Sequence, residues 1–208
     1  MLQRISFPVP GGEIAGILHL PDGEVHGAVA VLAGRVHTID SAAYLCEPIA
    51  GAGFAALRFA HRSDDGLERL ADTAAAIRLL RAHPAIPQWV GVVGQSYGAA
   101  IAALAAGRDS RLRSVVLIAP PAQRDYFGPI KPVAELSRTR ARVLIISPTA
   151  DTVVPPADGD RYATVLRQGG APCRVLRIDG ADHQFTDPEH RASMVAAVTA
   201  WLRETLPG

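Results

Sequence analysis

The sequence has almost no excess of charge of either sign. Its 208 residues carry 21 Lys and Arg against 20 Asp and Glu, which gives a formal net charge of +1 at pH 7. Nucleic acids and anionic membrane surfaces attract proteins through concentrated positive charge, and a nearly neutral chain carries no such signal. We therefore expect neither a nucleic acid nor a membrane as a partner.

Long apolar runs and cysteines are also scarce. No stretch approaches the roughly 18 consecutive apolar residues of a membrane-spanning helix, and the N-terminal MLQRISFPVPGGEIAG lacks the apolar segment and cleavage site of a signal peptide. The two cysteines, Cys46 and Cys173, fit no metal-ligand or redox spacing. An exported protein could join them in one disulfide, but we favour two small apolar side chains in a reducing cytosol. The expected location is therefore the cytoplasm.

What the sequence does contain is a series of apolar runs of strand length. Residues 4–21 predict a β-hairpin that turns at Gly11-Gly12. Near-continuous apolar runs are typical of strands covered on both faces, as in a parallel sheet. Such runs follow at residues 27–34, 54–60, 89–94, 114–120, 142–148 and 173–179.

Helical patterns alternate with these runs, at residues 42–53, 65–83, 96–107, 157–170 and 189–206. This alternation implies right-handed crossovers and a mostly parallel sheet with helices on both faces. Pro48 should break or kink the first helix, and Gly107 should cap the third. Leu67 should share a buried stripe with Leu70 in the second. No linker or repeat divides the chain, so we expect one α/β domain over residues 1–208.

Three residues with catalytic chemistry lie just beyond the carboxyl ends of predicted strands. Ser96, Asp151 and His183 follow the third, fifth and sixth apolar runs after the hairpin. Open α/β sheets bind their ligands at this edge. A serine becomes a nucleophile when a base takes its proton, an imidazole suits that work near neutral pH, and a carboxylate fixes the tautomer of the ring. The sequence therefore predicts a nucleophile, its base and the acid behind that base.

The predicted nucleophile lies in a turn that its neighbours make possible. In Gly94-Gln95-Ser96-Tyr97-Gly98, glycines flank the serine because a sharply folded backbone leaves no room for Cβ atoms. The amide of Tyr97 begins the following helix, whose dipole favours negative charge at that end. We therefore predict that this amide donates one hydrogen bond to an oxyanion.

These features together resemble the α/β-hydrolase superfamily, and the likeness extends over essentially the whole chain. Residues 94–98 resemble its nucleophile elbow, while SPTADTVVP and GADHQF resemble the acid and histidine loops of small cap-less members, among them dienelactone-hydrolase-like enzymes and short carboxylesterases. The resemblance implies a mostly parallel sheet of about eight strands, an N-terminal hairpin, helices on both faces and no cap domain. It also implies that an ester or thioester of a small acyl group is cleaved through an acyl-enzyme.

One departure from this family follows the run at residues 27–34. Relatives usually carry a His-Gly pair there, and the next residue donates the second N–H of the oxyanion hole. Here the stretch is Ala33-Gly34-Arg35, so the resemblance assigns that donor to the amide of Arg35 and removes a histidine that commonly braces the loop. Four further residues near this edge are candidates for substrate binding, although each could equally be a solvated or packing residue: His37, His61, Tyr126 and Phe127.

The sequence leaves simpler interpretations open. Ser96 could be an inert turn residue, and His183 a surface residue paired with its neighbouring acid. Asp151 could cap the following helix or close an Asx turn. The alternatives to an esterase or thioesterase are a non-catalytic binding module with the same fold and a cofactor-free perhydrolase. No acidic or histidine cluster has metal-ligand spacing, and no glycine-rich dinucleotide fingerprint follows the first parallel strand. We expect a small-molecule ester or thioester as partner, no metal or cofactor, and a monomer or homodimer.

Overall fold

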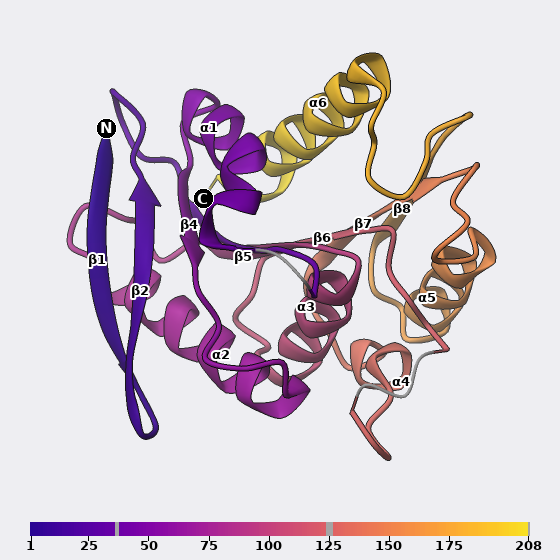
Figure 1. Ribbon diagram of the computed structural model, residues 1–208, viewed down its shortest axis with the longest axis horizontal. Coiled ribbons are helices and arrows are strands. Elements are labelled where there is room, and N and C mark those ends of the chain that lie inside the picture. Colours follow the sequence, from indigo (N-terminus) through magenta and orange to yellow (C-terminus); the bar gives the residue numbers. More distant parts are fainter. Residues whose placement is uncertain (36–37, 124–126, 208) are drawn as a thin grey trace.

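An eight-stranded β-sheet lies at the centre of the computed structural model, which describes residues 1–35, 38–123 and 127–207 (Figure 1). Its order is β1-β2-β4-β3-β5-β6-β7-β8. β2 pairs antiparallel with β1 and β4, and the later neighbours pair in parallel. This confirms the expected mostly parallel sheet with an N-terminal hairpin. The strands are β1 (Leu2–Val9), β2 (Gly12–His19), β3 (Ala28–Leu32), β4 (Ala55–Phe59), β5 (Val90–Gln95), β6 (Ser114–Ile118), β7 (Arg142–Pro148) and β8 (Cys173–Ile178).

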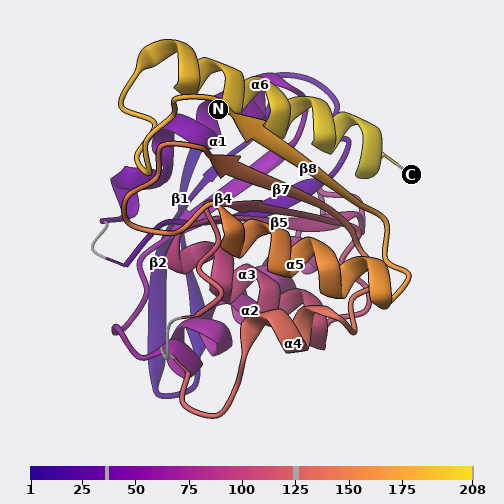
Figure 2. The same cartoon turned by 90° about the vertical axis from the view of Figure 1, so that its right-hand side faces the viewer.

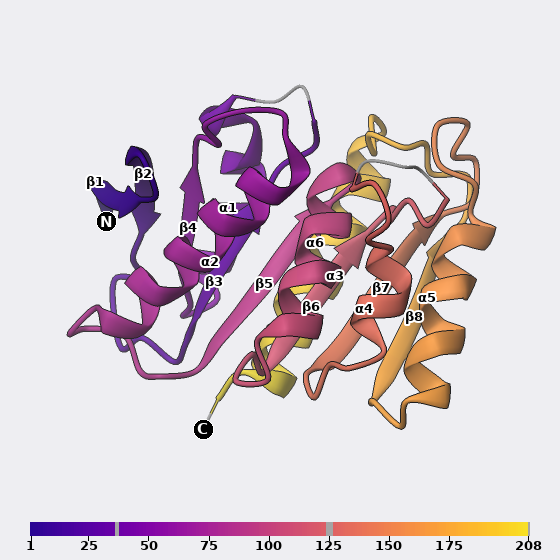
Figure 3. The same ribbon diagram turned by 90° about the horizontal axis from the view of Figure 1, so that it is seen from below.

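Helices cover both faces of this sheet (Figure 2). One face carries α1 (Ala43–Gly51), preceded by the 3-10 helix η1 (Ile39–Ala42), and α6 (Pro188–Thr205). The other carries α2 (Gly66–Ala82), α3 (Tyr97–Arg108), α4 (Pro132–Leu136) and α5 (Ala157–Gln168), which Figure 3 shows side by side. Within the described residues, α4 is the helix between β6 and β7, and no cap domain is inserted there. Among all the described residues, no helix combines the length and apolarity needed to cross a membrane.

The near-continuous apolar runs reflect this two-sided covering. In β3 the side chains of Ala28, Ala30 and Leu32 pack in the core beneath α2 and α3. The alternate residues Val29 and Val31 pack in the core beneath α1 and α6. A strand with a helical layer on each side has no solvent face, so both sets of alternating side chains are apolar. The parallel strands are therefore readable from the sequence.

The structure contradicts two expectations about helices, the break at Pro48 and the buried position of Leu67. α1 runs unbroken from Ala43 to Gly51 with Pro48 inside it. Pro48 costs the helix a single backbone hydrogen bond, and the burial of apolar side chains on the same helix offsets that loss. In α2, Leu67 is 48 % exposed while the polar Asp72 is fully buried. The face of α2 that packs against the rest of the protein therefore includes the polar Asp72 and does not include Leu67.

The expected role of Gly107 is also wrong, because α3 continues through it to Arg108 and is capped by Asp109. A Cβ atom on Gly107 would lie 2.1 Å from the backbone oxygen of Glu135 in α4. Real Cβ atoms do not come that close to a backbone oxygen. Glycine at this position therefore allows α4 to pack directly against α3.

Candidate active site

Ser96 occupies a strained turn between the end of β5 and the start of α3. Its backbone has φ 53° and ψ −120°, a conformation that non-glycine residues seldom adopt. Neighbouring backbone leaves no room for larger residues on either side. A Cβ on Gly94 would lie 2.3 Å from the oxygen of Gly98, and one on Gly98 would lie 2.3 Å from the oxygen of Leu32. The two glycines thus permit the turn that presents the hydroxyl at the sheet edge.

The structure brings Ser96, His183 and Asp151 together in one hydrogen-bonded chain. Ser96 Oγ lies 2.9 Å from His183 Nε2, and His183 Nδ1 lies 2.7 Å from Asp151 Oδ2. The carboxylate can only accept, so Nδ1 carries the ring proton and Nε2 is left to accept the proton of the serine. The side chains of His183 and Asp151 are 6 % and 1 % exposed. This arrangement makes the hydroxyl a potential nucleophile whose base and acid are both shielded from water.

The turn after β7 fixes the orientation of the Asp151 carboxylate. Its second oxygen, Oδ1, accepts hydrogen bonds from the amides of Val153 and Val154, each at 2.8 Å. The turn-closing role that the sequence left open is therefore present, alongside the contact with the imidazole. With one oxygen held by two amides, the other points at His183.

The loop that carries His183 is held by its neighbours. Asp182 Oδ1 accepts from the amides of Gln184 and Thr186, and the hydrogen bonds from Thr186 and the neighbouring amides lower the pKa of this carboxyl below its usual value. Phe185 adopts φ 50° and is fully buried. Asp182 therefore organises the loop, and the structure records no contact between its carboxylate and the imidazole beside it.

Sequence reasoning missed two residues that support this loop. Gln95, directly before the serine, donates from Nε2 to the backbone oxygen of His183 at 3.3 Å. Its Oε1 accepts a hydrogen bond from the hydroxyl of Tyr44 in α1. Burial raises the pKa of Tyr44 to about 12, so this hydroxyl keeps its proton and remains a donor. The position of Gln95 within residues 94–98 could have pointed to its role. Tyr44 lies 51 residues from Gln95 in the sequence and carries no such signal.

The two predicted oxyanion donors lie at facing segments of the sheet edge. Tyr97 is the first residue of α3, and Arg35 lies in the turn after β3. A Cβ on Gly98 would also lie 2.6 Å from the oxygen of Ala33, which shows how closely the start of α3 approaches that turn. The ring of Tyr97 points away from solvent and is stacked on Phe127, with 5.6 Å between ring centroids. Only its amide is therefore assigned to the site.

The four candidate substrate contacts have different positions. Phe127 is 5 % exposed and packs on Tyr97 and against Gly66 at the start of α2. His61 has a 10 % exposed side chain, with Nδ1 3.6 Å from Asp72 Oδ2, and burial lowers its pKa below the usual value. The contacts of these two side chains are therefore with Asp72 and with Tyr97. The other two candidates, His37 and Tyr126, lie outside the described residues.

A small hollow of about 210 Å³ borders the site. It is lined by residues adjacent to each part of the constellation: Gly34 in the turn after β3, Gln95 before the serine, and Gln184 after the histidine. Arg191 adds a cationic side chain to its wall. Ser96, His183 and Asp151 do not line this hollow themselves, so it borders the hydrogen-bonded chain through their neighbours in sequence.

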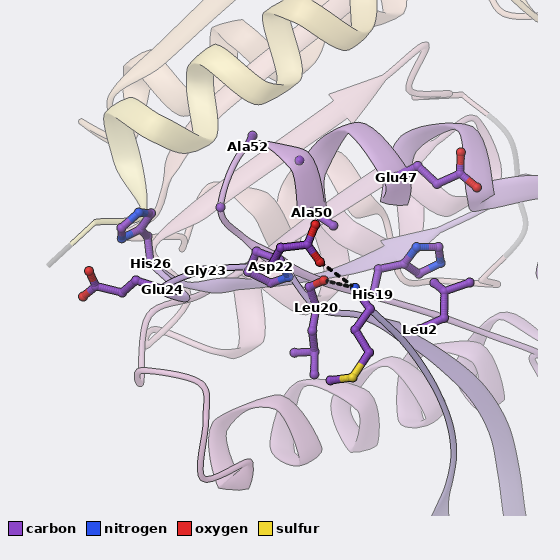
Figure 4. Close-up of a pocket in the computed structure, with 14 residues that line it drawn as sticks. Leu2, His19, Leu20, Asp22, Gly23, Glu24, His26, Glu47, Ala50 and Ala52 are labelled. Carbon is purple, nitrogen blue, oxygen red and sulfur yellow. Dashed lines mark hydrogen bonds and ion pairs between the residues drawn. The ribbon is translucent and has the colours of Figure 1, made fainter.

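A larger hollow of about 660 Å³ lies at the opposite, amino-terminal edge of the parallel strands (Figure 4). It is lined by His26 and Gly53, which precede β3 and β4, and by the acidic Asp22, Glu24 and Glu47. It therefore has no part in the chemistry at Ser96. Among the described residues, no group of three or more His, Cys, Asp and Glu could hold a metal ion.

Comparison with known proteins relates this geometry to one family. The model of the dienelactone hydrolase family matches residues 53–206. Acylamino-acid-releasing enzyme 2 of Oryza sativa subsp. japonica is 25 % identical over 104 residues, which is 50 % of this chain and 13 % of the rice enzyme. The matched part is thus a small portion of that curated relative.

Solved structures of low sequence identity share the fold over nearly their whole length. DcsB, solved in complex with its substrate analogue, has 16 % identity and a TM-score of 0.87, with 100 % of both chains covered. Dienelactone hydrolase from Anabaena variabilis has 20 % identity and a TM-score of 0.83, with 99 % of this chain and 98 % of that chain covered. The α/β-hydrolase fold expected from the sequence is therefore confirmed. Since the family model spans most of its length, the chain belongs to the dienelactone hydrolase family.

Proposed function

We propose that this protein is a serine hydrolase that cleaves an ester or thioester of a small acyl group. Ser96 is the nucleophile, His183 the base and Asp151 the carboxylate that orients the base. The proposal rests on the hydrogen-bonded chain that joins these three side chains, built on a serine with φ 53°. A serine that only shaped a turn would need neither an imidazole at 2.9 Å nor a buried carboxylate behind it. Membership of a hydrolase family supports the same conclusion.

The first half-reaction forms an acyl-enzyme. Ser96 Oγ attacks the carbonyl carbon of the substrate while His183 Nε2 takes the hydroxyl proton. Asp151 stabilises the imidazolium that results, because its Oδ2 already accepts the Nδ1 proton. The amides of Tyr97 and Arg35 donate to the oxyanion. The tetrahedral intermediate collapses as His183 returns its proton to the leaving alcohol or thiol.

The second half-reaction releases the acid. A water molecule replaces the leaving group, His183 takes one of its protons, and the resulting hydroxide attacks the acyl carbon. The second tetrahedral intermediate collapses with the proton returned to Ser96 Oγ. With the substrate and this water, the protons balance over the cycle.

Labelling with a fluorophosphonate tests this proposal directly. The probe should modify Ser96 in the wild-type protein and leave Ser96→Ala unlabelled. Turnover of p-nitrophenyl acetate by the variant should fall by about 10⁴- to 10⁶-fold in kcat, since the nucleophile is gone. The surface variant Ser137→Ala, whose hydroxyl bonds only Ala134 O, serves as the matched control and should retain labelling and turnover.

Two outcomes would contradict the proposal. Absence of label would favour a non-catalytic binding module, and label on another residue would mean that Ser96 is not the nucleophile. The second outcome concerns the double variant that carries both Ser96→Ala and His183→Ala. Its turnover should be no slower than that of either single variant, because residues that act as one unit do not contribute additively. Additive losses would mean that the two side chains act in separate steps.

A further inference from the structure

The turn after β3, which carries the proposed Arg35 donor, borders a small hollow on its α2 side. The hollow measures about 90 Å³ and is lined by Ala33 and Gly34 of the turn and by Ala60, His61 and Arg69 among others. A hydrogen-bond donor is useful to an oxyanion only if its direction is fixed before the reaction. A polar contact across this hollow can fix the direction of the peptide groups in the turn.

Arg69 supplies that contact from the first turn of α2. Its guanidinium donates from Nη2 to the backbone oxygen of Arg35 at 3.0 Å, and Nη1 lies 3.5 Å from the oxygen of Gly34. The residue is 6 % exposed. The other side of the guanidinium is anchored, since Nε donates to Ser63 O at 2.9 Å and Nη2 pairs with Asp64. Arg69 is thus fixed on α2 and reaches across to the turn.

The same guanidinium also lies over the ring of Tyr97, 5.1 Å from its centroid. Tyr97 and Arg35 are the residues whose amides are the two proposed oxyanion donors. One buried cation therefore contacts both segments of the hole, and it sets the position of one relative to the other. The planar fork of arginine can make several such contacts at once, which a lysine ammonium cannot do with the same geometry.

The direction of the Arg35 amide follows from the geometry of the peptide. The Arg35 N–H and the Gly34 carbonyl belong to one planar trans peptide, so they point in opposite directions. With the carbonyl turned toward Arg69, the N–H points away from α2. A cationic donor near the carbonyl also polarises the peptide and strengthens its N–H as a donor.

We infer that Arg69 is a positioning residue of the oxyanion hole, which orients the Arg35 amide through the Gly34 and Arg35 carbonyls. This role rests on the proposed serine hydrolase function. It predicts that loss of the guanidinium lowers the rate of oxyanion formation without affecting nucleophile activation, because no recorded contact joins Arg69 to Ser96, His183 or Asp151.

The test compares an oxoester with its thionoester, p-nitrophenyl acetate and p-nitrophenyl thionoacetate. A sulfur anion accepts amide hydrogen bonds weakly, so the thionoester depends less on the hole. In Arg69→Met, kcat for the oxoester should fall by about 10- to 100-fold, less than the loss of a whole donor, with little change in KM. For the thionoester, kcat should fall by less than about threefold. The ratio of kcat for the oxoester to kcat for the thionoester should therefore drop. Arg69→Lys should give an intermediate ratio.

Arg58→Met is the matched control. Arg58 is equally buried, at 6 % exposure, and it too donates to a backbone oxygen after β3, that of Ile39, and pairs with Asp40. Its hydrogen bonds go to His19, Ile39 and Asp40, and not to Gly34 or Arg35. A comparable loss of thermal stability is expected, but any change in rate should be equal for the two substrates.

The outcomes separate the two proposals. If the wild type neither labels at Ser96 nor turns over, the serine hydrolase function has failed. If it does both but Arg69→Met slows the two substrates equally, or slows neither, the inference about Arg69 alone is overturned. If Arg69→Met does not fold, Arg69→Lys decides, and a wild-type ratio in that variant overturns the inference.

Discussion

Asp151 uses its two carboxylate oxygens for different partners: one closes the turn with Val153 and Val154, and the other faces His183. This division makes the effect of Asp151→Asn specific. The asparagine oxygen would take the place of Oδ1 on the two amides, because an NH₂ group cannot accept from them. Its NH₂ would then face Nδ1 of the imidazole as a donor.

We therefore expect Asp151→Asn to hold the imidazole in the wrong tautomer. With Nδ1 forced to accept, Nε2 carries the proton and cannot take one from Ser96. The expected loss is about 10⁴-fold in kcat, measured on p-nitrophenyl acetate, with an unchanged melting temperature. Asp160→Asn, on an exposed carboxylate of α5, is the control and should be fully active. Near-wild-type activity in Asp151→Asn would mean that Asp151 only closes its turn.

At this scale the sequence could predict some roles and not others. Ser96, Asp151 and His183 could be proposed because each follows a readable strand, and Ser96 also lies between two glycines. The contacts of Arg69 and Tyr44 could not be found in this way. Their partners lie 34 and 51 residues away, and nothing in the local sequence of either helix marks it as reaching the sheet edge.

At the scale of the elements, the close packing of α3 against α4 depends on the absence of a side chain at Gly107. A Cβ at Gly107 would lie 2.1 Å from the backbone oxygen of Glu135, so Gly107→Ala must push the two helices apart. Alanine favours a helix over glycine by about 1 kcal/mol. Overpacking against the backbone costs about 1 to 3 kcal/mol and should outweigh it. The net effect should be a lower melting temperature, by a few degrees in a chain of this size.

Thermal unfolding of Gly107→Ala beside Gly51→Ala checks this. Gly51 ends α1, and a Cβ atom added there would meet no heavy atom within 4 Å, so its alanine variant should be neutral or slightly stabilised. A Gly107→Ala variant as stable as the wild type would show that α4 moves at little cost.

Strands were easier to predict than the details of helices. The parallel strands β3 to β7 are buried on both faces, and their composition alone identifies them. Helix faces depend on what lies opposite. α2 turns Asp72 inward because Arg62 pairs with it there, at 2.7 Å, and Leu67 is correspondingly exposed. A stripe of apolar residues at helical spacing cannot reveal that partner.

For the molecule as a whole, parallel strands explain how distant residues meet. Ser96 and His183 are 87 residues apart, yet both lie at the carboxyl ends of parallel strands and so at one edge of the sheet. The expected fold alone was enough to place them there. It did not determine the volume next to them, because that depends on side chains of α1, α6 and the turn after β3.

We expect the proposed hydrolase to accept only short acyl groups. The hollow next to the site measures about 210 Å³, below the roughly 300 to 1,000 Å³ of typical small-molecule pockets. Between β6 and β7 the described residues form loops and the five-residue α4, which is too short to serve as a lid. A long acyl chain would therefore extend into water.

We expect kcat/KM to be higher for p-nitrophenyl acetate or butyrate than for the octanoate. Each fully buried CH₂ would contribute about 0.8 kcal/mol, close to fourfold in kcat/KM, and a chain left in water gains none of this. The measurement is a series of p-nitrophenyl esters from C2 to C10 below their critical micelle concentrations, with Ser96→Ala as the background. A kcat/KM that rises steadily to the longest chain would contradict the open site, because only a continuous apolar tunnel could supply that gain at every methylene.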